Sequence, residues 1–80
     1  MKFAERLRQA RKACELKQYE LAKMAYIHRN AISTYELGHR LPTLDMAVSL
    51  AQVLGVSLDW LVGLSDEGGP EEWEWLKTNT

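Results

Sequence analysis

Cysteine is almost absent from this 80-residue chain, and so is any long hydrophobic run. Cys14 is the single cysteine, which excludes an internal disulfide and makes a reducing, cytoplasmic setting the expected one. The Met1-Lys2-Phe3 start lacks the apolar core of a secretory signal, and no stretch approaches the roughly 20 apolar residues of a membrane span. We therefore expect one small domain without a membrane segment, held together by packed helices, by oligomerisation or by both.

Strand patterns are missing as well, because no segment alternates between apolar and polar residues. Apolar residues recur instead at helical spacing. In the first such segment they are Phe3, Leu7, Ala10 and Cys14. The spacing predicts an all-α fold of five helices, with the later four over about 18–25, 29–37, 44–54 and 58–62.

Residues that start and stop helices support these limits. Thr43 and Ser57 are suited to cap the fourth and fifth helices. Gly38, Gly55 and Gly63 follow the ends of three helices, where glycine commonly stands. We expect Leu37, Leu44 and Leu58 to point inward with the other apolar residues of their helices.

The C-terminal part has a different composition. Residues 65–69, Ser-Asp-Glu-Gly-Gly, read as a flexible linker. Pro70 and two glutamates then open a predicted short helix over 70–77, which carries Trp73, Trp75 and Leu76. We divide the chain into a domain at 1–64 and an acidic tail at 65–80. These large apolar side chains need a partner surface, so we expect them, with Trp60, at a dimer interface; folding back on the same monomer is the alternative.

Charge is distributed unevenly although the net charge is only −1. Residues 1–40 hold nine lysines and arginines against four glutamates, and residues 41–80 hold seven acidic residues against Lys77 alone. The first half therefore carries +5 and the second −6. A polyanion is attracted to the first half and repelled by the second.

Two short helices joined by the three residues 26–28 have the geometry that places one helix in the major groove of DNA. At this point the chain resembles the helix-turn-helix of the phage-repressor and Cro class, called the XRE family. The resemblance covers about residues 3–63. It rests on Gln18-Tyr19-Glu20-Leu21-Ala22, Ile27, Ile32-Ser33, Tyr35-Glu36, Gly38, Arg40, Pro42, Leu50-Ala51 and 54–61.

The resemblance implies a recognition helix at 29–37 and a preceding helix that crosses the phosphate backbone. Base contacts are then expected from Arg29, Asn30, Ser33 and Thr34, which also lie opposite the inward Ile32 and Tyr35. Backbone contacts are expected from Lys17, Gln18, Lys23, His28 and Arg40. Arg11 and Glu36 are expected to form a structural ion pair, and Gln18 to brace the recognition helix.

Three residues depart from the family pattern. Lys17 and His28 stand where a Ser or Thr usually caps the second and third helices. Each lost cap lowers the stability of the fold by about 1 kcal/mol. Tyr26 stands in the turn, where the family usually has glycine or a small residue. If this position needs a left-handed backbone, tyrosine destabilises the fold by about 1–2 kcal/mol. The alternative is that Tyr26 changes the turn geometry and with it the angle between the second and third helices.

No constellation of catalytic or metal-ligating residues was found. His28, His39 and Cys14 lack metal-ligand spacing, and no phosphate loop or nucleophile–base pair is present. We expect no enzyme, metal or cofactor. The sequence favours a repressor that binds a palindromic operator as a homodimer. The alternative is an antitoxin that binds a toxin through residues 64–80 and regulates its own operon.

Overall fold

A computed structural model describes residues 2–70, and the structural statements below refer to these residues. They form α1 (Phe3–Ala13), α2 (Gln18–Ala25), α3 (Arg29–Glu36), α4 (Leu44–Leu54) and α5 (Leu58–Val62), with no strand in this range. The all-α, five-helix prediction is confirmed. None of the described helices is long and apolar enough to cross a membrane.

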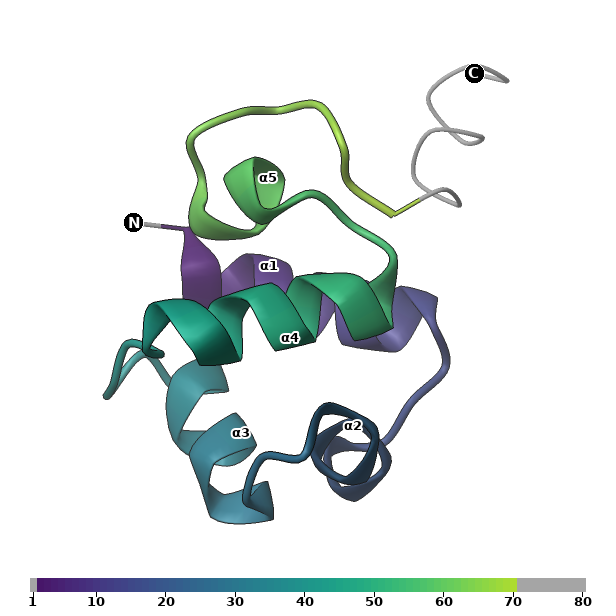
Figure 1. Cartoon of the computed structure of the whole chain (residues 1–80), viewed down its shortest axis with the longest axis vertical. Helices are drawn as coiled ribbons and strands as arrows, with labels where there is room; N and C mark the ends of the chain where they lie inside the picture. The colour runs from purple at the N-terminus through teal and green to yellow at the C-terminus, as the bar shows by residue number, and fades with distance from the viewer. Residues whose placement is uncertain (1, 71–80) are drawn as a thin grey trace.

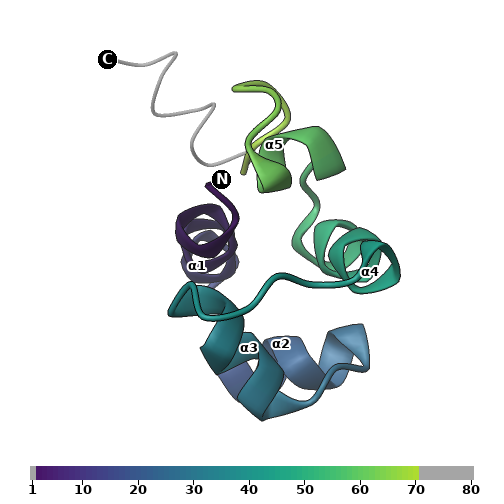
Figure 2. The same cartoon turned by 90° about the vertical axis from the view of Figure 1, so that its left-hand side faces the viewer.

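The helices are stacked so that α2 and α3 occupy one end of the molecule and α5 the other. Helices α1 and α4 lie between these ends (Figure 1). Helix α3 packs against α1 and α2, while α4 packs against α2 and α5. A view rotated by 90° about the vertical axis shows α3 at the outer edge of the molecule, beside α2 (Figure 2). Helix α3 is therefore supported from behind and free on its outer side.

One apolar face of each helix builds the core. Phe3, Leu7, Leu21, Ile32, Leu50 and Leu61 are its largest fully buried side chains. The rings of Phe3 and Tyr35 meet edge to face with centroids 5.7 Å apart, which joins α1 to α3. Burying one such side chain contributes about 1.5–3 kcal/mol. The core thus fixes α3 against the rest of the bundle.

The helix ends agree with most of the sequence signals. Thr43 and Ser57 accept hydrogen bonds from the backbone nitrogens of Met46 and Trp60, so both predicted caps are confirmed. His28 also caps: its Nδ1 accepts a 3.4 Å hydrogen bond from the nitrogen of Asn30. The prediction that α3 lacks a side-chain cap is therefore wrong, because an imidazole nitrogen takes the place of the hydroxyl.

Leu37 and Leu44, which were predicted to point inward, are exposed instead, as is Cys14 at the end of α1. Leu37 follows the last residue of α3 and lies two positions after the buried Tyr35, out of phase with the inward face. Leu44 is the first residue of α4, is 71% exposed and lies beside an apolar hollow. All three departures occur at a helix end, where the 3.6-residue period no longer constrains a side chain to point inward.

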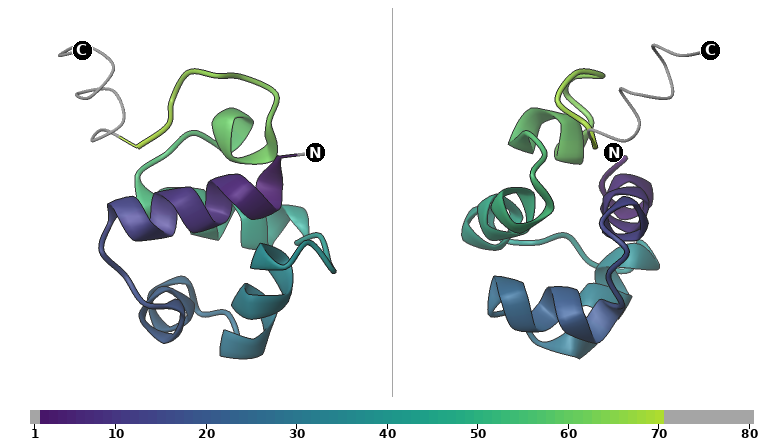
Figure 3. Two further views of the ribbon diagram at one scale, coloured as in Figure 1. Left: turned by 180° about the vertical axis from the view of Figure 1, so that it is seen from behind. Right: turned by 90° about the vertical axis from the view of Figure 1, so that its right-hand side faces the viewer.

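Residues 64–70, which we call the strap, pass over α5 (Figure 3). The nitrogen of Ser57 donates to the carbonyl of Gly68 at 2.8 Å, and Pro70 is buried. Arg6 donates to the Ser65 carbonyl at 2.6 Å and to the Asp66 carboxylate at 2.8 Å. The flexible-linker prediction for 65–69 is therefore wrong. The domain division at 64/65 stays a prediction, since residues 71–80 lie outside the described part.

Trp60 is buried inside its own chain. The Arg6 guanidinium lies 4.9 Å from the ring centroid, and Gly69 lies so close that an added Cβ would stand 2.7 Å from the indole nitrogen. At 3% exposure the indole has no surface left for a second subunit. We therefore correct the prediction of Trp60 as a dimer contact. Trp73, Trp75 and Leu76 lie outside the described residues.

Candidate nucleic-acid interface

The turn between α2 and α3 is held in one conformation. Tyr26 adopts the left-handed region, with φ 57° and ψ 40°, so the first of the two alternatives for this position holds. Ile27 is buried, and its nitrogen donates to the Ala22 carbonyl at 2.9 Å. From α4, the Ser49 hydroxyl donates to the Ala25 carbonyl at 3.0 Å. These contacts set the angle between α2 and α3.

The outer face of α3 is polar. Arg29 and Asn30 are exposed in the first turn, whereas Ile32 and Tyr35 are buried on the opposite side. The Thr34 hydroxyl donates to the Asn30 carbonyl at 2.7 Å. Thr34 therefore keeps its methyl group and its oxygen lone pairs for an external contact.

An ion pair joins the end of α3 to α1. Arg11 Nε and Glu36 Oε2 are 2.6 Å apart, and Arg11 Nη2 donates to Glu36 Oε1 at 2.9 Å. The two side chains are 12% and 5% exposed, so the predicted pair is present and largely buried. The hydrogen bonds to Glu36 raise the pKa of Arg11. Arg11 also donates to the Leu16 carbonyl at 2.8 Å, which holds the connection to α2.

Gln18, the first residue of α2, joins the same cluster. Its Nε2 donates to Glu36 Oε1 at 3.3 Å. The contact agrees with the expected bracing of α3 by Gln18. The four other predicted backbone contacts, Lys17, Lys23, His28 and Arg40, are all exposed. Lys17 and His28 directly precede α2 and α3, Lys23 lies on α2, and Arg40 lies in the connection that follows α3.

A polar hollow lies beside this cluster, and sequence reasoning did not find it. Its volume is about 220 Å³, and its lining consists of Arg8, Arg11, Gln18, Ser33, Glu36 and Leu37. Arg8 and Ser33 come from α1 and α3, so only the packing of these two helices brings them together. Arg8 precedes Arg11 by three residues, nearly one helical turn, which was the available signal in the sequence.

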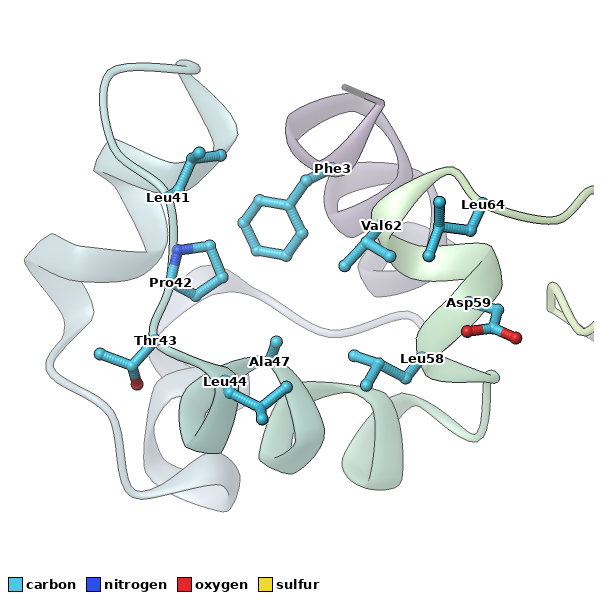
Figure 4. A pocket seen from close by; sticks show the side chains of 10 residues that line it. All are labelled: Phe3, Leu41, Pro42, Thr43, Leu44, Ala47, Leu58, Asp59, Val62 and Leu64. Atoms are coloured by element: carbon cyan, nitrogen blue, oxygen red, sulfur yellow. The ribbon is translucent and has the colours of Figure 1, made fainter.

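A second hollow is apolar and lies away from α2. Phe3, Leu41, Leu44, Ala47, Leu58 and Val62 surround it together with four further residues (Figure 4). Its volume is about 380 Å³.

Among residues 2–70, no three His, Cys, Asp or Glu side chains come together as metal ligands.

Known proteins are similar to this chain in sequence and in fold. The chain matches the helix-turn-helix family over residues 7–61. It is 38% identical over 69 residues to YobD, an uncharacterized HTH-type transcriptional regulator of Bacillus subtilis, covering 86% of this chain and 62% of YobD. It is 38% identical over 63 residues to RstR, the cryptic phage CTXphi transcriptional repressor of Vibrio cholerae. This match covers 79% of this chain and 56% of RstR. The chain thus spans less than two thirds of either relative.

A solved structure shows the same fold. The P22 c2 repressor, in complex with a synthetic operator, is similar to this chain with a TM-score of 0.71 and 32% identity. The similarity covers 74% of this chain and 89% of that one. The family match, the five helices and the α2–α3 geometry agree with one another. The chain belongs to the helix-turn-helix family of DNA-binding transcriptional regulators, in the phage-repressor and Cro class.

Proposed function

We propose that this chain represses transcription by binding a two-fold symmetric operator as a homodimer, with α3 of each subunit in a major groove. The observation that carries the proposal is the composition of the outer face of α3. Arg29 presents a two-pronged donor that suits guanine O6 and N7, and Asn30 suits adenine N6 and N7. The methyl group of Thr34 suits a thymine methyl.

The charge distribution supports the same orientation. The predicted backbone contacts are basic or polar residues at the starts of α2 and α3, within α2 and in the connection that follows α3. Helices α2 and α3 form one end of the molecule (Figure 1). Between residues 41 and 70 the charged residues are all acidic, namely Asp45, Asp59, Asp66 and Glu67. Lysines and arginines of the first forty residues therefore attract DNA, whereas residues 41–70 add no positive charge.

The relatives favour regulation over the alternative. RstR is named a transcriptional repressor, and P22 c2 is a repressor seen on an operator. None of the relatives named above is described as an antitoxin. A repressor is accordingly the function that we assign.

A homodimer follows from the small reach of one helix. A single α3 touches few base pairs, whereas two half-sites one helical turn apart raise both affinity and specificity. With Trp60 buried, the apolar hollow beside α4 is the surface that we propose for the second copy. It adjoins the connection from α3, and Leu41, Leu44 and Leu64 are exposed around it. A symmetric contact there leaves the outer face of α3 free.

Selection of bound duplexes from random DNA tests this proposal. We expect enrichment of an inverted repeat whose half-site centres are about 10 base pairs apart. The double variant Arg29→Ala, Asn30→Ala serves as the control and should enrich no sequence. Equal recovery of all sequences by the wild-type protein would contradict sequence-specific binding. An enriched site without two-fold symmetry would contradict the homodimer.

A further inference from the structure

We propose that the polar hollow formed by Arg8, Gln18 and Ser33 holds one phosphate of the DNA backbone. Ser33 then contacts the backbone and not a base, in contrast to its predicted role. The inference rests on the proposed DNA binding and adds a subsite to it. Neither Arg8 nor this hollow was among the predicted contacts.

The position of Ser33 on α3 distinguishes it from Asn30 and Thr34. Ser33 is three residues from both Asn30 and Glu36, so it lies between the outer face of α3 and the stripe that faces α1, where Glu36 pairs with Arg11. Asn30 and Thr34 form a neighbouring stripe and are hydrogen-bonded to each other through the Asn30 carbonyl. Ser33 is half-buried at the α1 edge and lines the hollow. Its hydroxyl is therefore directed to a different part of the DNA than Asn30 and Thr34.

The charge of the hollow favours an anion. Arg11 and Glu36 neutralise each other, and both oxygens of the Glu36 carboxylate already accept hydrogen bonds. Arg8 is exposed and makes no ion pair with any residue in the described range, which leaves one positive charge at this site. A single anionic group near Arg8 is thus favoured over a cation.

The hydrogen-bonding groups favour a phosphate in particular. Arg8 offers a two-pronged donor that matches phosphate oxygens. The Ser33 hydroxyl has no hydrogen-bond partner among residues 2–70, and the Gln18 amide has a second N–H beyond the one directed at Glu36. About 220 Å³ is room for several water molecules at about 30 Å³ each, or for a phosphate group that displaces them. Three donors from three helices converge on this space.

Variants of the hollow test the proposal on the selected operator and on random DNA. We expect Arg8→Ala to weaken binding to both by the same factor, about tenfold, and to lower the slope of log affinity against log salt by about 1. Ser33→Ala should also weaken both equally and leave the base preference unchanged. Lys12→Ala is the matched control, because Lys12 is an exposed cation on the same helix that does not line the hollow; it should leave the slope unchanged.

Duplexes with one neutral methylphosphonate locate the phosphate. For the wild-type protein, a methylphosphonate at one backbone position in each half-site should lower the affinity. For Arg8→Ala, a methylphosphonate at that position should cause no additional loss of affinity. Full wild-type sensitivity of Arg8→Ala at every position would overturn the proposal. So would a changed base preference in Ser33→Ala. If the wild-type protein does not bind the selected operator more tightly than random DNA, the proposed function itself is contradicted, and the subsite depends on that function.

Discussion

Tyr26 is the residue at which this chain departs most clearly from its family. It adopts a left-handed backbone, and its side chain is 95% exposed, so no packing offsets the strain. Glycine adopts this region without the penalty of about 1–2 kcal/mol. We expect Tyr26→Gly to raise the free energy of unfolding by about 1 kcal/mol, measured as a higher urea midpoint at constant slope. Tyr26→Ala keeps the strain and should give no gain; equal midpoints for all three proteins would contradict this explanation.

The Arg11–Glu36 pair is the most buried charge contact at the candidate site. Removing either partner leaves the other charge without compensation in a side chain that is 12% exposed or less. We expect Arg11→Ala and Glu36→Ala each to destabilise the fold by about 3–5 kcal/mol. The double variant should lose much less than the sum of the two, as thermal or urea unfolding can measure. Losses below about 1 kcal/mol, typical of exposed pairs, would show that the pair contributes little.

At the scale of the helices, local signals were sufficient where a short stretch of sequence decides the outcome. The bounds of α2 and the caps Thr43 and Ser57 depend on residues within one turn of each other. Leu44 and Leu37 were misplaced, because an apolar residue at a helix end has no second turn to fix its direction. The cap at His28 was missed, since the expected acceptor was a hydroxyl.

The strap over α5 could not be predicted from composition. Two glycines after acidic residues are typical of a linker, but here they allow the backbone to lie close to Ser57 and Trp60. An added Cβ at Gly68 would lie 2.3 Å from the Ser57 hydroxyl oxygen, and φ is +90°. We expect Gly68→Ala to destabilise the protein by about 2–4 kcal/mol, the sum of strain and overpacking.

The matched control for this variant is Gly55→Ala. Gly55 also has a positive φ of 69°, but an added Cβ meets nothing within 4 Å. Gly55→Ala should therefore lower the stability only by the backbone strain, about 1–2 kcal/mol. Equal losses for the two variants in a thermal unfolding series would contradict a packed strap.

At the scale of the whole molecule, the fold and the helix-turn-helix pair could be predicted, but not the contacts between distant segments. The α2–α3 pair is encoded in the 19 consecutive residues 18–36, which lie inside the family match. Arg6 and Trp60 are separated by 54 residues, and Arg8 and Ser33 lie on different helices. Such pairs depend on how the helices pack, which periodicity along one helix does not specify.

The proposed dimer surface gives a prediction at the same scale. Leu44 and Leu64 are 71% and 80% exposed beside the apolar hollow, so a charge at either position should not disturb the monomer. We expect Leu44→Glu with Leu64→Glu to raise the dimer dissociation constant at least about tenfold, because interface centres exclude charge. Met24→Glu, on the exposed side of α2, is the control. Unchanged sedimentation equilibrium for the double variant would contradict this surface.

The central claim is that α3 reads base sequence, and one comparison tests it most directly. The affinities of the wild type and Arg29→Ala are measured for the selected operator and for operators with each base pair changed singly. We predict that Arg29→Ala loses about 1–3 kcal/mol on the selected operator and no longer discriminates at one base pair in each half-site, while discrimination elsewhere is retained. A uniform loss of affinity over all operators would contradict the claim and would show that Arg29 contacts only the backbone.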